Sequence, residues 1–362
     1  MNIIVDEEMI TGKISEQDLT KYNTSARICG NIMVELLGKI KNKESLCIKE
    51  LEEFANIRIE EECSKIYKKE KIKGIAFPTS ISLNDCVGNY LYEEDDGSKP
   101  KVKEYNYIKN GDIVKIEMGV NLCGCIVNLG ETIIYSDNKE LDNELFEKHG
   151  KYLELLEILK GDIIDNVKIG ETNDEIKINI ESKCTEYGCF PVENTISYQH
   201  LDGQLQTDDS KYIICNYRDN NIIDDTEESL DNLCFEFEEG EIYTINLKII
   251  PNDNNNYDET IHQYYKSEDV HIYRFNDKYY NLKLKASREF CSIAKGKHCT
   301  NAFNCLEYKK DSRHRLGIKE CFENGILERY PILYSKDKLP IYHKKFTIVV
   351  GKDKTFSFKC FK

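Results

Sequence analysis

Two polar residues that could bind a metal ion lie eleven residues apart in the segment KIEMGVNLCGCIVNLGETI (residues 115–133). Glu117 offers a carboxylate and Asn128 offers a side-chain amide. The glycine-bearing turn between them predicts a β-hairpin with one of these residues on each arm. The hairpin is therefore a candidate metal site or the remains of one.

Other chemistry-bearing patterns are weak. Cys123 and Cys125 form a CxC pair, and alternation along a strand would place both thiols on one face. A lone CxC is a poor zinc signal, so free thiols are the better interpretation. His200 follows Tyr198 by two residues, which would place it about 7 Å further along a strand, so a metal-binding role for His200 is not favoured. The sequence contains no HExxH, GxSxG, GxxxxGK[ST] or GxGxxG motif, so these classes of hydrolase and nucleotide site have no support.

The chain of 362 residues is 40% hydrophobic, which is enough for a full core. The sequence contains no run of eighteen apolar residues, so it predicts no membrane span. The start MNIIVDEEMITGKISEQ lacks the basic and apolar regions of a secretory signal. Fifteen cysteines without CxxC pairs indicate free thiols in a cytoplasmic protein.

Charge is distributed unevenly along the chain. The formal net charge is −15, but residues 266–362 contain 22 Lys and Arg against 11 Asp and Glu, a net +11. The first 265 residues therefore carry −26. A basic end that faces an anionic partner, with nucleic acid as the usual candidate, is one interpretation. An ordinary drift of surface charge is the other.

Apolar spacing predicts a mixed α+β fold. Helices are expected around residues 28–40, from 48 into IEEECSKIYKKEK, around 153–156, and after a Thr172–Glu175 capping box. Strands are expected in GIAFPTSISLNDCVGNY, the hairpin, CFPVENTISY, KYIIC, EIYTINLKII, KKFTIVV and TFSFKCF. Two successive helix-helix-strand blocks indicate two similar halves, about 20–140 and 141–265 plus 336–362. The helical period returns in residues 273–334, which predicts an inserted helical subdomain within one domain, 1–362.

Several short words in this order resemble the type 2 methionine aminopeptidases, and still more their proliferation-associated, ErbB-receptor-binding relatives. The words are AFPTSIS, residues 112–119, FPVENTIS, EIYTIN, LKLKASREF and KKFTIVV, and the resemblance spans roughly residues 20–355. It implies a pita-bread fold, in which two pseudo-two-fold halves enclose a pocket, with a helical insertion in the C-terminal half.

The resemblance also identifies where metal ligands would lie. Active peptidases of that family hold two divalent metals with two aspartates, one histidine and two glutamates. Matched one by one, these ligands fall on Glu117, Asn128, Tyr198, Asn246 and Lys345, with Lys344 as the alternative for the last. A substrate-facing histidine of the family falls on Asn89.

The charges of the matched residues oppose metal binding. Two divalent ions about 3.5–4 Å apart bring a charge of +4. At an effective dielectric of about 20, two such ions repel each other by roughly 16 kcal/mol. Glu117 supplies one carboxylate and Lys345 an ammonium with no lone pair, so the set sums to about zero. We therefore expect no metal or other cofactor and no peptidase activity.

A buried ammonium needs a partner, and Glu117 is the available anion. The sequence therefore predicts an ion pair between Glu117 and Lys345, or Lys344, where the metals would have been. In the alternative, the lysine extends outward and Tyr198 fills the pocket.

Basic residues cluster in the expected insertion and suit contacts with RNA phosphates. Tyr279, Tyr280 and Phe290 lie among them and could stack on unpaired bases. A solvated helix face with its aromatic residues in the core is the alternative. The basic candidates are Lys283, Lys285, Arg288, Lys295, Lys297, Lys309, Lys310, Arg313 and Arg315.

The resemblance to the inactive relatives implies a function. It implies a monomer that binds the large ribosomal subunit, its RNA and its exit-site proteins during assembly or translation, in the cytoplasm and also the nucleus or nucleolus. Two alternatives remain. One is a module that binds peptides or histone tails in the old pocket, and the other is an active metallo-aminopeptidase.

Overall fold

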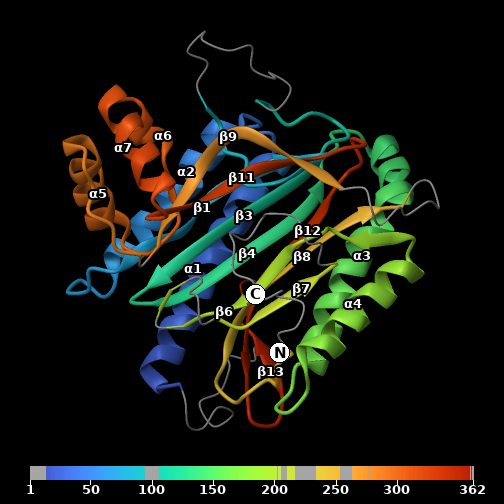
Figure 1. The fold of residues 1–362 in the computed structure, drawn as a ribbon. Helices are drawn as coiled ribbons and strands as arrows, with labels where there is room; N and C mark the ends of the chain where they lie inside the picture. Colours follow the sequence, from blue (N-terminus) through green and yellow to red (C-terminus); the bar gives the residue numbers. More distant parts are fainter. Residues whose placement is uncertain are drawn as a thin grey trace.

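The computed structural model describes residues 14–93, 106–201, 203–204, 210–216, 234–252, 263–276, 278–358 and 360. Within these residues, a nine-stranded sheet forms the centre of the molecule (Figure 1). Its main path runs in the order β1 (Lys73–Leu83), β3 (Ile113–Leu122), β4 (Cys125–Ile134), β12 (Tyr342–Val350), β8 (Ile242–Pro251), β6 (Thr195–Gln199) and β7 (Tyr212–Cys215). β13 (Thr355–Ser357) pairs with β12, and β5 (Cys189–Pro191) pairs with β8.

Two pairs of helices pack against this sheet, one pair for each half. α1 (Glu16–Lys41) and α2 (Ile48–Lys65) share a core with β1, β3 and β4, whereas α3 (Lys139–Asn166) and α4 (Asn173–Glu186) share a core with β8 and β12. Strand alternation sorts the side chains. Ile116 and Met118 of β3 join the helical core, so Lys115 and Glu117 face the opposite side. We call this opposite side the inner face of the sheet.

A second, four-stranded sheet covers part of the inner face. Its order is β10 (Phe303–Asn304), β9 (Tyr264–Phe275), β11 (Leu327–Ser335) and β2 (Cys86–Gly88). Ile272 of β9 and Tyr330 of β11 pack with Phe77, Ile126 and Tyr198 of the large sheet. The two sheets therefore enclose a shared apolar layer.

The segment expected to be a helical insertion is only partly helical. It contains α5 (Lys285–His298), α6 (Leu306–Lys309) and α7 (Ser312–Glu323), which lie to one side of the large sheet (Figure 1). Its two ends belong to β9 and β11, which pair with each other from Phe275 to Tyr264. The insertion is therefore an α/β unit built on the second sheet. Its independence as a subdomain stays a prediction.

Two local expectations are wrong, and a third is confirmed. Cys123 lies in the hairpin turn with a φ of 58°, and Gly124 follows at 89°, so Cys123 and Cys125 do not alternate along one strand. The helix expected from residue 48 into IEEECSKIYKKEK is confirmed, since α2 begins at Ile48 and ends at Lys65, where Ile66 turns extended. Thr172 is the N-cap of α4 but makes no side-chain capping bond, and its backbone instead forms a β-bridge with Glu236.

The C-terminal segment lies directly against α1. A Cβ built on Gly30 would sit 1.2 Å from the carbonyl oxygen of Cys360, and the ring of Tyr22 stacks on Phe358 at 5.0 Å. By contrast, a Cβ on Gly38 of the same helix meets nothing within 4 Å.

We predict opposite effects for two substitutions in α1. Gly30→Ala should lower the free energy of unfolding by about 1–3 kcal/mol, because the added methyl group overlaps the backbone at Cys360. Gly38→Ala should raise it by up to about 1 kcal/mol through helix propensity. Urea unfolding of both variants measures the two values. Equal values would contradict the close packing of the C-terminal segment on Gly30.

Candidate functional site

The five residues matched to metal ligands come together on the inner face, and we call them the relic site: Glu117, Asn128, Tyr198, Asn246 and Lys345. They lie on β3, β4, β6, β8 and β12 of the large sheet. Gly130 pairs with both Glu117 and Lys345, and Lys345 pairs with Asn246, so one row crosses four strands. Tyr198 pairs with Thr244 in the next row.

The expected ion pair is present. The ammonium of Lys345 donates to the carboxylate of Glu117, and each side chain is only 6% exposed. The ammonium also lies 5.2 Å from the centre of the Phe77 ring. Lys344, the alternative, points to the helical side, where it pairs with Glu131 and Glu157. Of the two alternatives, Lys345 is therefore the lysine that shares the inner face with Glu117.

Asn128 is held by hydroxyl groups instead of a metal. Its Nδ2 donates to Thr244 Oγ1 at 3.0 Å, and its backbone N–H donates to Thr347 Oγ1 at 3.0 Å. A Cβ on Gly119, the cross-strand neighbour of Asn128, would come within 2.4 Å of Asn128 Oδ1. Glycine at position 119 therefore makes room for the amide.

On the other side of the Glu117–Lys345–Asn246 row lies a row that contains amines, which the sequence analysis missed. Lys115 pairs with Thr132, whose hydroxyl donates to the carbonyl of His343 at 2.7 Å, and His343 pairs with Lys248. Lys115, Lys248 and His343 are all buried. The signal was a lysine within each apolar strand, in IVKIEM and in INLKII. Only the cross-strand register shows that these lysines are neighbours.

Burial changes the protonation of this row. It lowers the pKa of Lys115 to about 7 and also lowers the pKa of Lys248. Burial and the nearby Lys248 hold the pKa of His343 well below its usual range. Burial and Lys345 lower the pKa of His200 to about 3, so both imidazoles are neutral at physiological pH. The structure thus limits the positive charge that surrounds Glu117.

The positions next to the relic site serve packing. His200 Nε2 contacts Thr244 Oγ1 at 2.7 Å and its ring stacks on Tyr198. Asn89, matched to the substrate-facing histidine, donates from Nδ2 to the carbonyl of Pro331 on β11 at 3.0 Å. This hydrogen bond connects Asn89 to β11 of the second sheet. Tyr198 is 9% exposed, so the aromatic filling suggested for the pocket accompanies the ion pair rather than replacing it.

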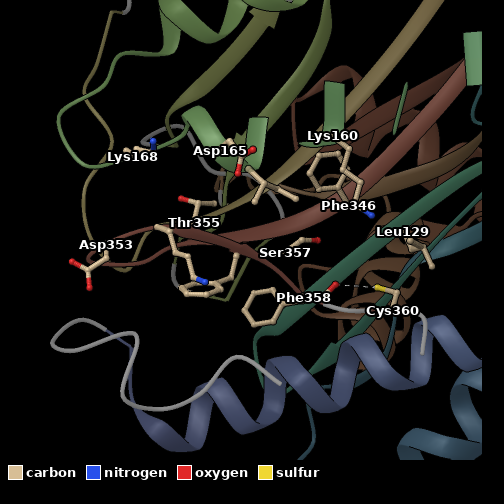
Figure 2. A pocket seen from close by; sticks show the side chains of 13 residues that line it. Leu129, Lys160, Asp165, Lys168, Phe346, Asp353, Thr355, Ser357, Phe358 and Cys360 are labelled. Carbon is tan, nitrogen blue, oxygen red and sulfur yellow. Dashed lines mark hydrogen bonds between the residues drawn. The ribbon is translucent and has the colours of Figure 1, made fainter. Parts of the chain in front are cut away.

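A cavity of about 720 Å³ lies elsewhere, between α3 and the β12–β13 hairpin (Figure 2). Phe346, Phe358 and Leu129 form its apolar lining, and Lys160 projects into it from α3. Phe346 follows Lys345 in the strand and so faces the helical side. This cavity is therefore separate from the relic site.

The basic residues of the insertion are mostly at the surface. Eight of the nine candidates are exposed, and the exception is Lys309, whose ammonium bonds to the carbonyl of Val270. Tyr279 is 95% exposed. Phe290 is fully buried among Phe275, Phe303 and Tyr308, so the idea that it stacks on bases is wrong. Its spacing on α5 reflects the core of the insertion.

Comparison with known proteins identifies the family. Residues 20–279 match the model of metallopeptidase family M24. The chain belongs to metallopeptidase family M24. Among curated M24 relatives, it is 28% identical over 359 residues to ERBB-3 binding protein 1 of Solanum tuberosum, covering 97% of this chain and 84% of that protein. It is 25% identical over 336 residues to proliferation-associated protein A of Dictyostelium discoideum, covering 91% and 78%.

Solved M24 structures confirm the pita-bread fold class. A thermophilic Arx1 superposes with a TM-score of 0.74 at 20% identity, covering 95% of this chain and 91% of that one. The methionine aminopeptidase of Rickettsia prowazekii gives a TM-score of 0.55 at 16% identity, covering 97% and 100%. The resemblance to the ErbB-receptor-binding branch and the pita-bread architecture are therefore confirmed.

The residues of this M24 chain do not fit the two metals that the family implies. Within the described residues, no group of three or more His, Cys, Asp or Glu side chains could hold a metal ion. Glu117 already binds an ammonium, and a lysine offers no lone pair while protonated. His343 Nε2 and Asn246 Oδ1 contact each other at 2.8 Å, so these two atoms, which could otherwise bind a metal, are already hydrogen-bonded to each other.

We predict strong coupling between Glu117 and Lys345. Lys345→Met should cost about 3–5 kcal/mol of unfolding free energy, because it leaves a buried carboxylate unpaired. Adding Glu117→Gln should recover more than half of that loss. Lys65→Met, which breaks the exposed pair with Glu62, should cost less than about 1 kcal/mol. Denaturant titrations measure the cycle, and additive losses at Glu117 and Lys345 would contradict the pairing.

We also predict a pH dependence that originates from Lys115. Its folded pKa, about 7, lies below the unfolded value of about 10.4, so the unfolded chain binds the proton more tightly. The stability due to Lys115 therefore rises with pH from about 7 to about 10, by roughly 1 kcal/mol per unit. Lys115→Met should remove this slope from the stability profile between pH 7 and 9. Parallel profiles for the two proteins would contradict the assignment.

Proposed function

We propose that this M24 protein is not a peptidase and binds the large ribosomal subunit, or its precursor, through the basic surface of the insertion. The observation that supports the first half is the Glu117–Lys345 ion pair, which joins two of the residues that the sequence resemblance matches to metal ligands. A protein that has lost the metal ligands but kept the whole fold is better explained by a binding role than by catalysis.

Exposure and charge support the RNA-binding half. Lys283, Lys285 and Lys310 are exposed and make no ion pair among the contacts of the described residues. Arg313 is 70% exposed although it pairs with Asp311. Such side chains can contact phosphates without first breaking a buried interaction. A relative in Schizosaccharomyces pombe, 27% identical over 328 residues, is named curved DNA-binding protein, which supports binding to a nucleic-acid backbone.

The inner face supports this proposal over a peptide-binding module. Tyr198, Phe77 and Tyr330 fill the space between the two sheets, and the rings of Phe77 and Tyr330 lie 5.6 Å apart, edge to face. A peptide or histone tail in the old pocket would have to displace them.

For the same ribosome-binding function, we propose a monomer that works in the cytoplasm, and in the nucleus or nucleolus where subunits assemble. Among the described residues, no helix is long and apolar enough to cross a membrane.

Sucrose-gradient sedimentation of cell lysate tests this function. At low salt the protein should travel with large subunits, and rising salt should release it because phosphate contacts are screened. A protein that stays at the top of the gradient at every salt concentration would overturn the ribosome proposal. Capture of basic peptides by the purified protein, with no binding to RNA, would favour the peptide-binding alternative.

We predict that charge reversal on the insertion weakens binding to ribosomal RNA. The triple variant Lys283→Glu, Lys285→Glu and Lys310→Glu should lower the affinity about tenfold or more. It should also flatten the plot of log affinity against log salt by about 2–3 units, because three phosphate contacts are lost.

The matched control reverses three exposed lysines on or directly after α3, which lies across the large sheet from the insertion (Figure 1): Lys148, Lys151 and Lys168. It makes the same change in net charge, so it should leave the salt dependence almost unchanged. Filter binding or sedimentation with purified large subunits measures both variants. Equal weakening by the two triple variants would show a nonspecific charge effect and contradict the insertion as the contact.

A further inference from the structure

Two thiols from different helices of the insertion touch each other. The sulfur atoms of Cys291 on α5 and Cys321 on α7 lie 3.4 Å apart, although the residues are 30 positions apart in the sequence. Both cysteines are free thiols. A disulfide needs a sulfur–sulfur distance of about 2.05 Å, so a small shift of the side chains would bring them to bonding distance.

The packing of the two helices holds this contact in place. The carboxylate of Glu320, next to Cys321, accepts hydrogen bonds from the backbone N–H groups of Lys283 at 2.9 Å and Leu284 at 3.1 Å. It also accepts one from Ser287 Oγ. A Cβ on Gly317 would lie 2.9 Å from the carbonyl oxygen of Ala286, so the backbones pass very close. The start of α5 is thus fastened to α7 beside the thiol pair.

The two thiols have different surroundings. Cys291 is partly exposed, whereas Cys321 is fully buried. The hydrogen bond from Cys321 lowers the pKa of Cys291, and the ammonium of Lys295, one helical turn further on, lowers it again. The same hydrogen bond and burial raise the pKa of Cys321. Cys291 is therefore the accessible thiol that reaches the reactive thiolate more easily.

We propose that Cys291 and Cys321 are a peroxide-oxidisable pair that closes to a reversible disulfide between α5 and α7. The Cys291 thiolate attacks one oxygen of hydrogen peroxide, which breaks the O–O bond and gives a sulfenic acid and hydroxide. The sulfur of Cys321 then attacks the sulfur of Cys291, forming the S–S bond and expelling the second hydroxide. The two thiol protons convert both hydroxides to water. The thiols lose two electrons to the peroxide, and a dithiol reductant restores them.

A second thiol pair in the same chain provides an internal comparison. Cys184 and Cys189 also interact through their side chains, but both are fully buried in the core of the other half. Peroxide cannot reach them while the protein is folded. Selective oxidation of the insertion pair is therefore a property of this fold, and it does not depend on what the basic surface of the insertion binds.

The test treats the folded, full-length protein with hydrogen peroxide, alkylates the remaining thiols after unfolding, and digests it with trypsin without reduction. Cys291 and Cys321 are the single cysteines of tryptic peptides 289–295 and 320–329. We expect a cross-linked peptide that joins them, weighs two hydrogens less than their sum and disappears on reduction. Cys184 and Cys189 share peptide 184–211, which should be recovered with both thiols alkylated.

Two variants and a second measurement keep the result interpretable. Cys291→Ser should abolish the cross-link, whereas Cys299→Ser, at another partly exposed cysteine at the end of α5, should keep it. The oxidised protein should unfold at a higher temperature than the reduced protein. Conversion of Cys291 to sulfinic acid without the cross-link would overturn the proposal. So would equal oxidation of the Cys184–Cys189 pair, or no cross-link at peroxide concentrations that oxidise the exposed Cys234.

Discussion

The charge balance on the inner face of the large sheet governs the rest of this structure. Glu117 is the carboxylate of the relic site, and the ammonium of Lys345 is bound to it in a buried ion pair. Lys115 and Lys248 lie in the next row, where burial lowers their pKa values and so limits the positive charge. A dinuclear metal site needs the opposite arrangement, with several carboxylates around a charge of +4. Lys345, which the sequence resemblance matches to a metal ligand, thus carries an amine that is paired with a carboxylate.

The second sheet connects the closed site to the surface of the insertion. Its strands β9 and β11 supply Ile272 and Tyr330 to the layer that fills the inner face. The same two strands lead into and out of α5 and α7, which carry exposed lysines and arginines. Asn89 of the first half bonds to β11 and anchors this arrangement. The strands that cover the inner face thus also carry the helices with the basic surface.

Local patterns in the sequence were enough for the helices and the hairpin. The Glu117–Lys345 pair was predictable only because a resemblance aligned two residues that are 228 positions apart. The amine row was not, since the apolar pattern of β3 or β8 says nothing of how Lys115, His343 and Lys248 meet across strands. Phe290 was misread because spacing on a helix cannot tell a core face from a binding face. β9 and β11 were missed because the strands they pair with are distant in the sequence, so no local pattern shows the pairing.

Metal content tests the central claim most directly. The purified protein is dialysed against an excess of cobalt, manganese, zinc or iron(II), exchanged into metal-free buffer and examined by elemental analysis. If Lys345 occupies the metal position, the protein should retain far less than one ion per chain, and Lys345→Met should not restore two. Retention of about two ions per chain, together with release of N-terminal methionine from a test peptide, would contradict the account.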